Sequence, residues 1–399
     1  MPILLIFLFA YTFSQFYRSF LAVVTAELTH DLGLGPAELG NLTAIWFVTF
    51  ALSQFLVGYL LDRHGPRRTV SCMMLVAVAG AVLFSQASGY FTALLGMGLV
   101  GFGCSPILMG ALYYFGRRSA PEKFPVYTSI LVGFGNLGNL AGSRPLAQAV
   151  AAFGWRPSLL AIGAMTAIAA LLVYLIVEDP PVAKVDGPRK NALEELWQII
   201  SFRPLWPVFL LNFVSYAVIA AERGLWIGPF LDRVYGFGAL ERGNAAFLMG
   251  VGMALGALAV GWLVPILGSA RNVAVFGNLG TAAAFLCLGL IPGVGAGAAV
   301  ALLAISGLFG MCYGVILSHA RLFFPDHLLG KGVTFANFLS IGGAGIMLSG
   351  TGFLVRDAFD AGTPAVVTFA GLHLGFGVLL ILSLLIYVRA PAKPHSPMA

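Results

Sequence analysis

The sequence predicts an all-α integral membrane protein with twelve transmembrane helices in two six-helix bundles. Hydrophobic residues make up 59% of the 399 residues and charged residues 10%, against about 25% charged residues in a typical soluble domain. Apolar runs of about 20 residues, the length that crosses the bilayer core as a helix, recur along the whole chain. A membrane β-barrel would instead show segments of about ten residues with alternating polar and apolar side chains.

Each predicted span is an apolar run between charged or Pro- and Gly-rich breaks. The first run begins at Ile3 without a basic leader and is too long for a signal-peptide core, so we expect it to remain in the protein. The spans cover residues 3–27, 38–58, 69–88, 91–115, 124–150, 157–178, 204–231, 243–265, 273–292, 296–318, 333–355 and 364–388.

One long loop divides these spans into two groups of six. Its sequence, EDPPVAKVDGPRKNALEELWQIISFRP, has the Pro, Gly and charge content of a linker. Apolar residues at helical spacing within it favour an interfacial helix, with a partner-binding helix as the alternative; they are Leu193, Leu196, Trp197 and Ile200. The predicted organisation is an N-terminal bundle (residues 1–178), a cytoplasmic linker (179–203), a C-terminal bundle (204–390) and a tail (391–399).

The basic residues predict the orientation in the membrane. We place both termini in the cytoplasm. Of the Lys and Arg residues outside the spans, only Arg156, Arg233, Arg242 and Arg356 then lie on the opposite side, as the positive-inside rule requires. We therefore expect a multi-pass protein of the cell inner membrane. Topology also explains the net charge of +6, and because no basic run is dense, no nucleic-acid partner is expected.

The two halves repeat each other in sequence. A shift of 203 residues superposes the loops around span two on those around span eight, which implies a parallel repeat about an axis along the membrane normal. The matched pairs are Gly33 and Gly236, Gly35 and Gly238, Glu38 and Glu241, Gly40 and Gly243, Asn41 and Asn244, Gly58 and Gly261, Gly65 and Gly268, and Arg68 and Arg271.

The turn after span two, GYLLDRHGPRR, resembles the signature loop of the major facilitator superfamily, and GWR at Gly154–Arg156 extends the likeness. The resemblance implies a transporter that works by alternating access, commonly as a monomer. It also implies a conformational switch at Gly58, Asp62, Arg63, Gly65, Arg67 and Arg68. The alternative is a solvated turn that only anchors the topology. In the second half Pro265 stands where Asp62 would map, so we expect the switch in the first half only.

Four charged residues lie inside predicted spans, where charge is costly and points to function: Arg18, Arg144, Glu222 and Arg223. Polar side chains at helical spacing accompany them and are expected to line a central cavity; these are Tyr11, Gln15, Tyr216, Asn136, Asn139, Asn337 and Ser340. Because arginine outnumbers acid, we expect a small organic anion bearing carboxylate or phosphate. Arg18 is the predicted primary ligand and Arg223 or Arg144 the secondary one. The alternatives are an ion pair of Arg223 with Glu222 or Glu27, and an Arg144 that snorkels outward.

Two further resemblances concern the substrate. Arg18, after QFY, is similar to the first-helix arginine of the organic phosphate and organic anion branches of the superfamily. GFGNLGNLAG, Gly133–Gly142, resembles the fifth-helix signature of nitrate and nitrite porters. Those porters hold the anion with arginines in helices two and eight, and the spans predicted here at those places contain none, which argues against nitrate.

Glu222 is the predicted proton carrier, because it is the one acid well inside a span and desolvation favours the neutral carboxyl form. His319 and His373 are weaker candidates. Protons or a counter-solute would energise transport, as in symport. We expect no enzyme, cofactor or metal site, and treat Cys72, Cys104, Cys287 and Cys312 as packing residues. Drug efflux and a non-transporting assembly factor on the same fold remain alternatives.

Overall fold

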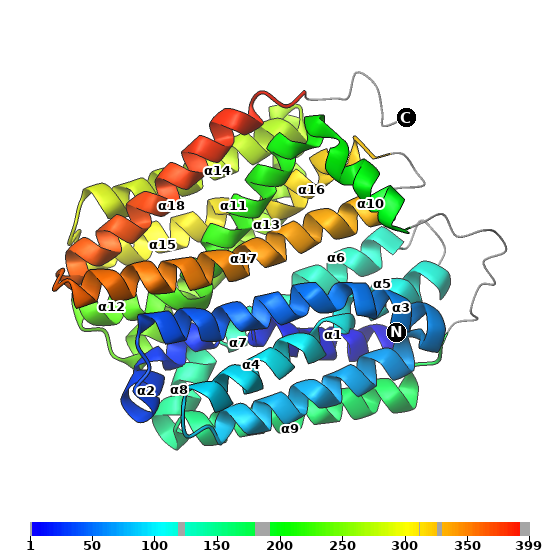
Figure 1. Cartoon of the computed structure of the whole chain (residues 1–399), viewed down its shortest axis with the longest axis horizontal. Helices are drawn as coiled ribbons and strands as arrows, with labels where there is room; N and C mark the ends of the chain where they lie inside the picture. Colours follow the sequence, from blue (N-terminus) through cyan, green and yellow to red (C-terminus); the bar gives the residue numbers. More distant parts are fainter. Residues whose placement is uncertain (1, 119–123, 180–191, 311, 325–328, 392–399) are drawn as a thin grey trace. The chain divides into compact units, whose positions relative to one another are not determined.

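The computed structural model describes residues 2–118, 124–179, 192–310, 312–324 and 329–391, and the regular elements among them are helices (Figure 1). The first half of the chain contains α1 (Pro2–Phe16), α2 (Leu21–Leu32), α3 (Pro36–Ser85), α4 (Tyr90–Cys104), α5 (Pro106–Arg118), α6 (Phe124–Gly135), α7 (Leu137–Ala141), α8 (Arg144–Phe153) and α9 (Trp155–Ile176).

The second half begins with α10 (Ala192–Ser201), so the helix predicted in the linker is formed. Ile199 of α10 is buried in an apolar cluster, whereas Trp197 is exposed, as an interfacial helix requires. The remaining elements are a 3₁₀ turn (Arg203–Leu205), α11 (Trp206–Ala221), a π-helix (Glu222–Trp226), α12 (Ile227–Tyr235), α13 (Ala239–Leu267), α14 (Ala270–Leu290), α15 (Ala296–Gly310), α16 (Tyr313–Arg321), α17 (Leu329–Asp360) and α18 (Ala365–Tyr387).

Within the described residues, ten helical segments are long and apolar enough to cross a membrane, and α1 with α2, bent by 47°, forms an eleventh candidate. Predicted span five is the exception. Residues 124–150 do not form one helix but the three short helices α6, α7 and α8. One break falls at Gly142 and Ser143, just before Pro145, which has no backbone N–H for a helical hydrogen bond.

The chain divides into two compact units, which are described separately. Unit 1 consists of Met1–Ala183, Arg223–Phe247 and Leu348–Asp357. Unit 2 consists of Lys184–Glu222, Leu248–Met347 and Ala358–Ala399. The functional division of the chain at residues 179–203 stays a prediction.

Glycines allow helices to approach closely inside each unit. In unit 1, a Cβ built on Gly138 of α7 would lie 1.9 Å from the Thr12 carbonyl oxygen of α1. In unit 2, a Cβ on Gly256 of α13 would lie 1.9 Å from the Leu308 carbonyl oxygen of α15. Helix α14 also packs along α18 (Figure 1). Of the glycines of GFGNLG, Gly135 and Gly138 serve helix packing, whereas Gly133 has open space around it.

Residues paired by the sequence repeat share a backbone conformation. Gly33 and Gly236 have φ of 65° and 70°, and Gly65 and Gly268 have φ of 74° and 77°. All four lie in the left-handed region, which glycine adopts without strain. The same turns are therefore built twice.

Candidate functional site

Arg18 lies in unit 1 at the break between α1 and α2. Residues 17–20 form a turn there, and the Arg18 side chain is partly buried. Its guanidinium carbon lies 5.2 Å from the centre of the Trp46 ring and 5.0 Å from that of the Phe50 ring, both on α3. The aromatic faces attract the cation without supplying an opposing full charge. The two rings therefore hold the guanidinium beside α3.

Two further pairs of candidates lie near each other in unit 1. Gln15 Nε2 donates to the Tyr11 hydroxyl at 2.8 Å, and Asn139 Nδ2 donates to Asn136 Oδ1 at 3.1 Å. A Cβ on Gly135 would lie 2.3 Å from the Tyr11 ring, so α1 and the broken span five face each other. The structure therefore brings four of the predicted polar residues together.

Arg223 is buried in unit 1, with 3% of its surface exposed. Its Nη2 donates to the Asn139 carbonyl oxygen at 2.7 Å and to Ser143 Oγ at 3.1 Å. The helix break accounts for this contact, because the Ser143 N–H bonds to the Leu140 carbonyl instead of that of Asn139. Arg223 thus caps a carbonyl that the break leaves without its helical partner.

The remaining donors of Arg223 are unsatisfied. Its Nε and Nη1 are buried and make no hydrogen bond within the described part of the chain. The ion pair with Glu222 or Glu27 that the sequence left open is not formed by these described side chains. A buried guanidinium with unused donors and no carboxylate beside it suits an anionic ligand.

Arg144 behaves differently from Arg18 and Arg223. It is the first residue of α8, and its side chain is exposed. The structure therefore does not bring Arg144 together with the other two arginines, and exposure favours the outward orientation that the sequence left as its alternative. Its role as a secondary ligand stays a prediction.

In unit 2, Glu222 pairs with a histidine. Glu222 Oε2 lies 3.2 Å from His373 Nε2 of α18, and both side chains are fully buried. The other carboxylate oxygen, Oε1, makes no hydrogen bond to any described residue. Glu222 begins the π-helix, and π-bulges are frequent at functional sites. Neither the pairing with His373 nor the π-helix followed from the sequence.

The other predicted residues of unit 2 are spread along α11, α16 and α17. Tyr216 and Asn337 are half-buried, and the Ser340 hydroxyl donates to the Ala336 carbonyl of its own helix at 3.1 Å. His319 bonds to the Tyr387 hydroxyl at 2.7 Å and to the Pro391 carbonyl at 3.1 Å. These bonds tie His319 to the end of α18, which makes it a structural residue.

The signature loop has a partner in unit 1 that the sequence did not reveal. Gly65 breaks α3 with a φ of 74°. The Asp179 carboxylate, after α9, accepts the Arg67 N–H at 2.7 Å and occupies the place of a Cβ on Gly65. Gly58, Arg63 and Arg68 are exposed, and the Asp62 side chain lies outside the described part. The switch role of this loop stays a prediction.

An arginine next to each repeated glycine turn bonds to the end of another helix, although Arg67 and Arg271 are not paired by the repeat, which matches Arg271 with Arg68. In unit 1, Arg67 Nε donates to the Tyr174 carbonyl near the end of α9 at 2.6 Å. In unit 2, Arg271 Nη2 donates to the Val388 carbonyl at the end of α18. Both arginines meet the C-terminal end of a helix, where the helix dipole favours a cation.

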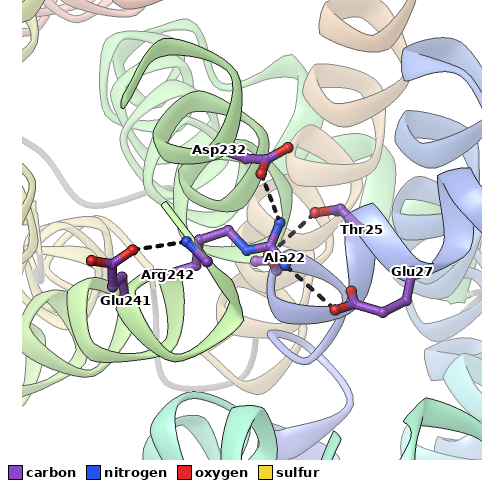
Figure 2. A network of polar contacts seen from close by, with 7 residues as sticks. Ala22, Thr25, Glu27, Asp232, Glu241 and Arg242 are labelled. Carbon is purple, nitrogen blue, oxygen red and sulfur yellow. Dashed lines mark hydrogen bonds and ion pairs between the residues drawn. The ribbon is translucent and has the colours of Figure 1, made fainter. Parts of the chain in front are cut away.

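Three of the arginines predicted to lie opposite the cytoplasm, Arg242, Arg156 and Arg356, have carboxylate or carbonyl partners. Figure 2 shows the Arg242 guanidinium between two acids of unit 1, with Nη1 3.3 Å from Asp232 Oδ1 and Nη2 3.5 Å from Glu27 Oε1. Arg156 donates to the Ser85 and Ala87 carbonyls. The sequence did not single out Arg242 as a buried residue, because one of its two partners, Glu27 of α2, is distant in sequence.

A further cap follows the repeat in unit 1. Glu241 accepts the Gly238 N–H at 2.8 Å (Figure 2), which is one half of a capping box at the start of α13. The repeated Gly35 and Glu38 are also close, since a Cβ on Gly35 would lie 2.9 Å from the Glu38 carboxylate. The repeated glycine and glutamate therefore define where spans two and eight begin.

Comparison with known proteins identifies the family. The chain is 27% identical over 192 residues to the nitrate/nitrite transporter NrtP of Nostoc punctiforme, a match that covers 46% of this chain and 38% of that protein. It is 32% identical over 263 residues to human monocarboxylate transporter 11, covering 59% and 50% of the two chains. The chain thus spans half or less of the length of these relatives.

Solved structures support the fold. A crystal structure of the nucleoside transporter NupG, in a mutant form, superposes with a TM-score of 0.81 at 13% identity, over 97% of this chain and 100% of that one. The sequence profile described as Major Facilitator Superfamily matches residues 7–243, which is more than half of the chain. With its apolar helices and repeated turns, the chain is a multi-pass membrane protein that belongs to the major facilitator superfamily.

Proposed function

We propose that this protein is a secondary transporter of a small organic anion bearing a carboxylate, and that it works by alternating access. Arg18 and Arg223 bind the anion, with Tyr11, Gln15, Asn136 and Asn139 as polar neighbours. The protein acts as a monomer in the cell inner membrane with both termini in the cytoplasm.

The observation that carries the proposal is the state of Arg223. Two of its nitrogens, Nε and Nη1, are buried and make no hydrogen bond to the described residues, and no described carboxylate is paired with it. An uncompensated buried charge is costly unless a ligand supplies the missing acceptors. A carboxylate accepts two parallel N–H bonds from a guanidinium. A bound anion would therefore complete the site.

The charge available in unit 1 supports a singly charged substrate. Arg18 is flanked by aromatic rings. The Nη2 nitrogen of Arg223 already donates to Asn139 and Ser143. Aromatic surroundings favour an anion with an apolar body over a strongly hydrated phosphate. A relative named as a monocarboxylate transporter agrees with this substrate class.

Nitrate or nitrite is the second candidate. The relatives named as nitrate/nitrite transporters support it, together with the fifth-helix sequence GFGNLGNLAG. The arginines of helices two and eight expected for such porters are absent from the predicted spans. Nitrate therefore enters the test as a competing ligand.

The experiment is a thermal-stability screen of the purified protein against monocarboxylates, dicarboxylates, sugar phosphates, nitrate and cationic drugs. A ligand at about 100 times its Kd stabilises the folded state by roughly 2.7 kcal/mol. Monocarboxylates should stabilise the wild type, and Arg223→Ala and Arg18→Ala should each lose at least tenfold in affinity. Arg356→Ala, which changes an exposed arginine paired with Asp357, is the matched control and should bind within twofold of wild type. Arg144→Ala tests the predicted secondary ligand.

Other outcomes would redirect the assignment. Stabilisation by nitrate alone would move the second candidate ahead. Stabilisation by cationic drugs alone would favour efflux, and the absence of any ligand effect would favour an assembly factor. Equal binding by wild type and Arg223→Ala would remove Arg223 from the site.

A further inference from the structure

We propose that His373 is a positioning residue for a proton-binding site at Glu222, and that the coupling proton is taken up and released at Glu222 Oε1. The proposal rests on the proposed transport function and adds to it a second residue and a defined atom. The sequence singled out Glu222 and gave His373 as a weaker candidate, and the geometry of unit 2 adds the contact between them.

The two carboxylate oxygens of Glu222 are in different situations. Oε2 lies 3.2 Å from His373 Nε2, and Oε1 is buried without a hydrogen bond to any described residue. If His373 carries its proton on Nε2, it donates to Oε2 in either state of the carboxyl group. Oε1 is then the atom at which a proton is added or removed.

The imidazole is held in place by aromatic packing. The His373 ring stacks on Phe285 of α14, with ring centres 5.9 Å apart and planes 16° from parallel. Phe285 in turn meets Phe376 edge to face at 5.5 Å. Both rings are almost fully buried. Packing therefore restricts the direction in which Nε2 can donate.

Among the described residues, Glu222 makes its ion pair with His373. On α14, Arg271 bonds to Val388 at the far end of α18, and Cys287 is exposed. His319 of α16 bonds to Tyr387 and Pro391 at that same far end. Helix α15 has no charged residue. Lys331 lies near the start of α17, and Arg321 lies at the end of α16. The guanidinium of Arg223 donates to Asn139 and Ser143.

Charge balance gives the pair a reason to bind a proton. With neutral His373 and ionised Glu222 the pair carries one negative charge in a site closed to water, which is costly. A proton on Oε1 makes the pair neutral, and loss of that proton restores the carboxylate. The His373 N–H stabilises the ionised form, so that release remains possible.

The experiment compares Glu222→Gln, His373→Gln and His373→Phe in proteoliposomes, with His319→Gln as a buried-histidine control. The substrate is the monocarboxylate selected by the binding screen. Glutamine at 373 keeps an N–H donor, whereas phenylalanine keeps only a ring. In Glu222→Gln and His373→Phe, the rate of uptake driven by a pH gradient should fall at least tenfold. The rate of substrate exchange should stay within about twofold of the wild-type rate. His373→Gln should retain gradient-driven uptake with a shifted pH profile, and His319→Gln should match wild type.

A measurement without substrate separates this proposal from the transport function. Infrared spectroscopy follows the band of the buried carboxyl group, which is assigned to Glu222 by its loss in Glu222→Gln. This band should titrate with pH in the wild type. In His373→Phe the carboxyl group should stay protonated. If the screen finds no ligand but this titration behaves as stated, the proton site stands while the substrate assignment fails.

Two results would overturn the proposal. Retention of wild-type coupling and titration by folded His373→Phe would show that Glu222 does not need the histidine. If His373→Gln is as uncoupled as His373→Phe, the imidazole itself carries the proton.

Discussion

Glu222 and Arg223 are consecutive residues, both described by the structure, whose side chains bond to different partners and not to each other. The Glu222 carboxylate meets His373 in unit 2, and the Arg223 guanidinium meets Asn139 and Ser143 in unit 1. Adjacent residues of a helix do not face each other. Each of the two side chains therefore meets a different set of neighbours.

Arg242→Ala should destabilise unit 1, because it leaves Glu27 and Asp232 without their shared cation. Removal of one partner from a fully buried ion pair costs about 3–5 kcal/mol. We expect about 2 kcal/mol here, because the Asp232 side chain is 41% exposed and partly screened by water. Thermal unfolding in detergent measures the change.

Arg356→Ala is the control for Arg242. Arg356 pairs with the adjacent Asp357, and both side chains are well exposed, so its loss should cost no more than about 1 kcal/mol. Equal melting temperatures for the two variants would show that the Arg242 ion pairs do not stabilise the unit.

Gly65→Ala should displace Asp179 from the signature loop. The new Cβ would lie 2.3 Å from Asp179 Oδ1, at a φ of 74° that costs an L-residue about 1–2 kcal/mol. Asp179→Ala removes both the clash and the acceptor for Arg67. In a double-mutant cycle, the stability lost by Gly65→Ala and the stability lost by Asp179→Ala should therefore sum to more than the stability lost by the double variant. Strict additivity would contradict the contact.

Two glycines of unit 2 should respond to alanine with opposite signs. A Cβ on Gly256 meets the Leu308 carbonyl at 1.9 Å, so Gly256→Ala should force α13 and α15 apart at a cost of about 1–3 kcal/mol. Gly371 of α18 has open space and a helical backbone, so Gly371→Ala should be neutral or stabilise by up to about 1 kcal/mol. Thermal unfolding of both variants tests the pair.

Much of the fold could be predicted from sequence because hydropathy and repetition are local signals. The helical class, the presence of a helix in the linker (Ala192–Ser201) and the positive φ of the repeated glycines agree with the sequence, and the interfacial placement of that helix stays a prediction. Span five was wrong as one helix, because composition does not show where a backbone bends. Its breaks depend on Gly142 and Pro145 and on Arg223, which supplies a donor from another part of the chain.

The candidate site was less predictable, because partners depend on tertiary structure. The sequence singled out Arg18, Glu222 and Arg223 by the cost of charge in lipid and gave His373 as a weaker candidate. The pairing of His373 with Glu222 and the contact of Asp179 with the signature loop became identifiable only through the structure. Arg242 did leave a signal, since it was one of four basic residues on the side where few are expected. A basic residue that departs from the topology rule is therefore worth testing for a buried ion pair.

The π-helix at Glu222–Trp226 also sets the rotational phase of the helix that follows it. One residue beyond a regular α-helix turns every later side chain by about 100°. In the observed phase Gly228 of α12 faces the Ala22 carbonyl, where a Cβ would come within 1.9 Å. Removal of one residue from the π-helix would rotate that glycine away and present a bulkier neighbour to α2. The one extra residue of the π-helix thus allows Glu222 and Arg223 to share a continuous helical segment with Gly228, which contacts α2 closely.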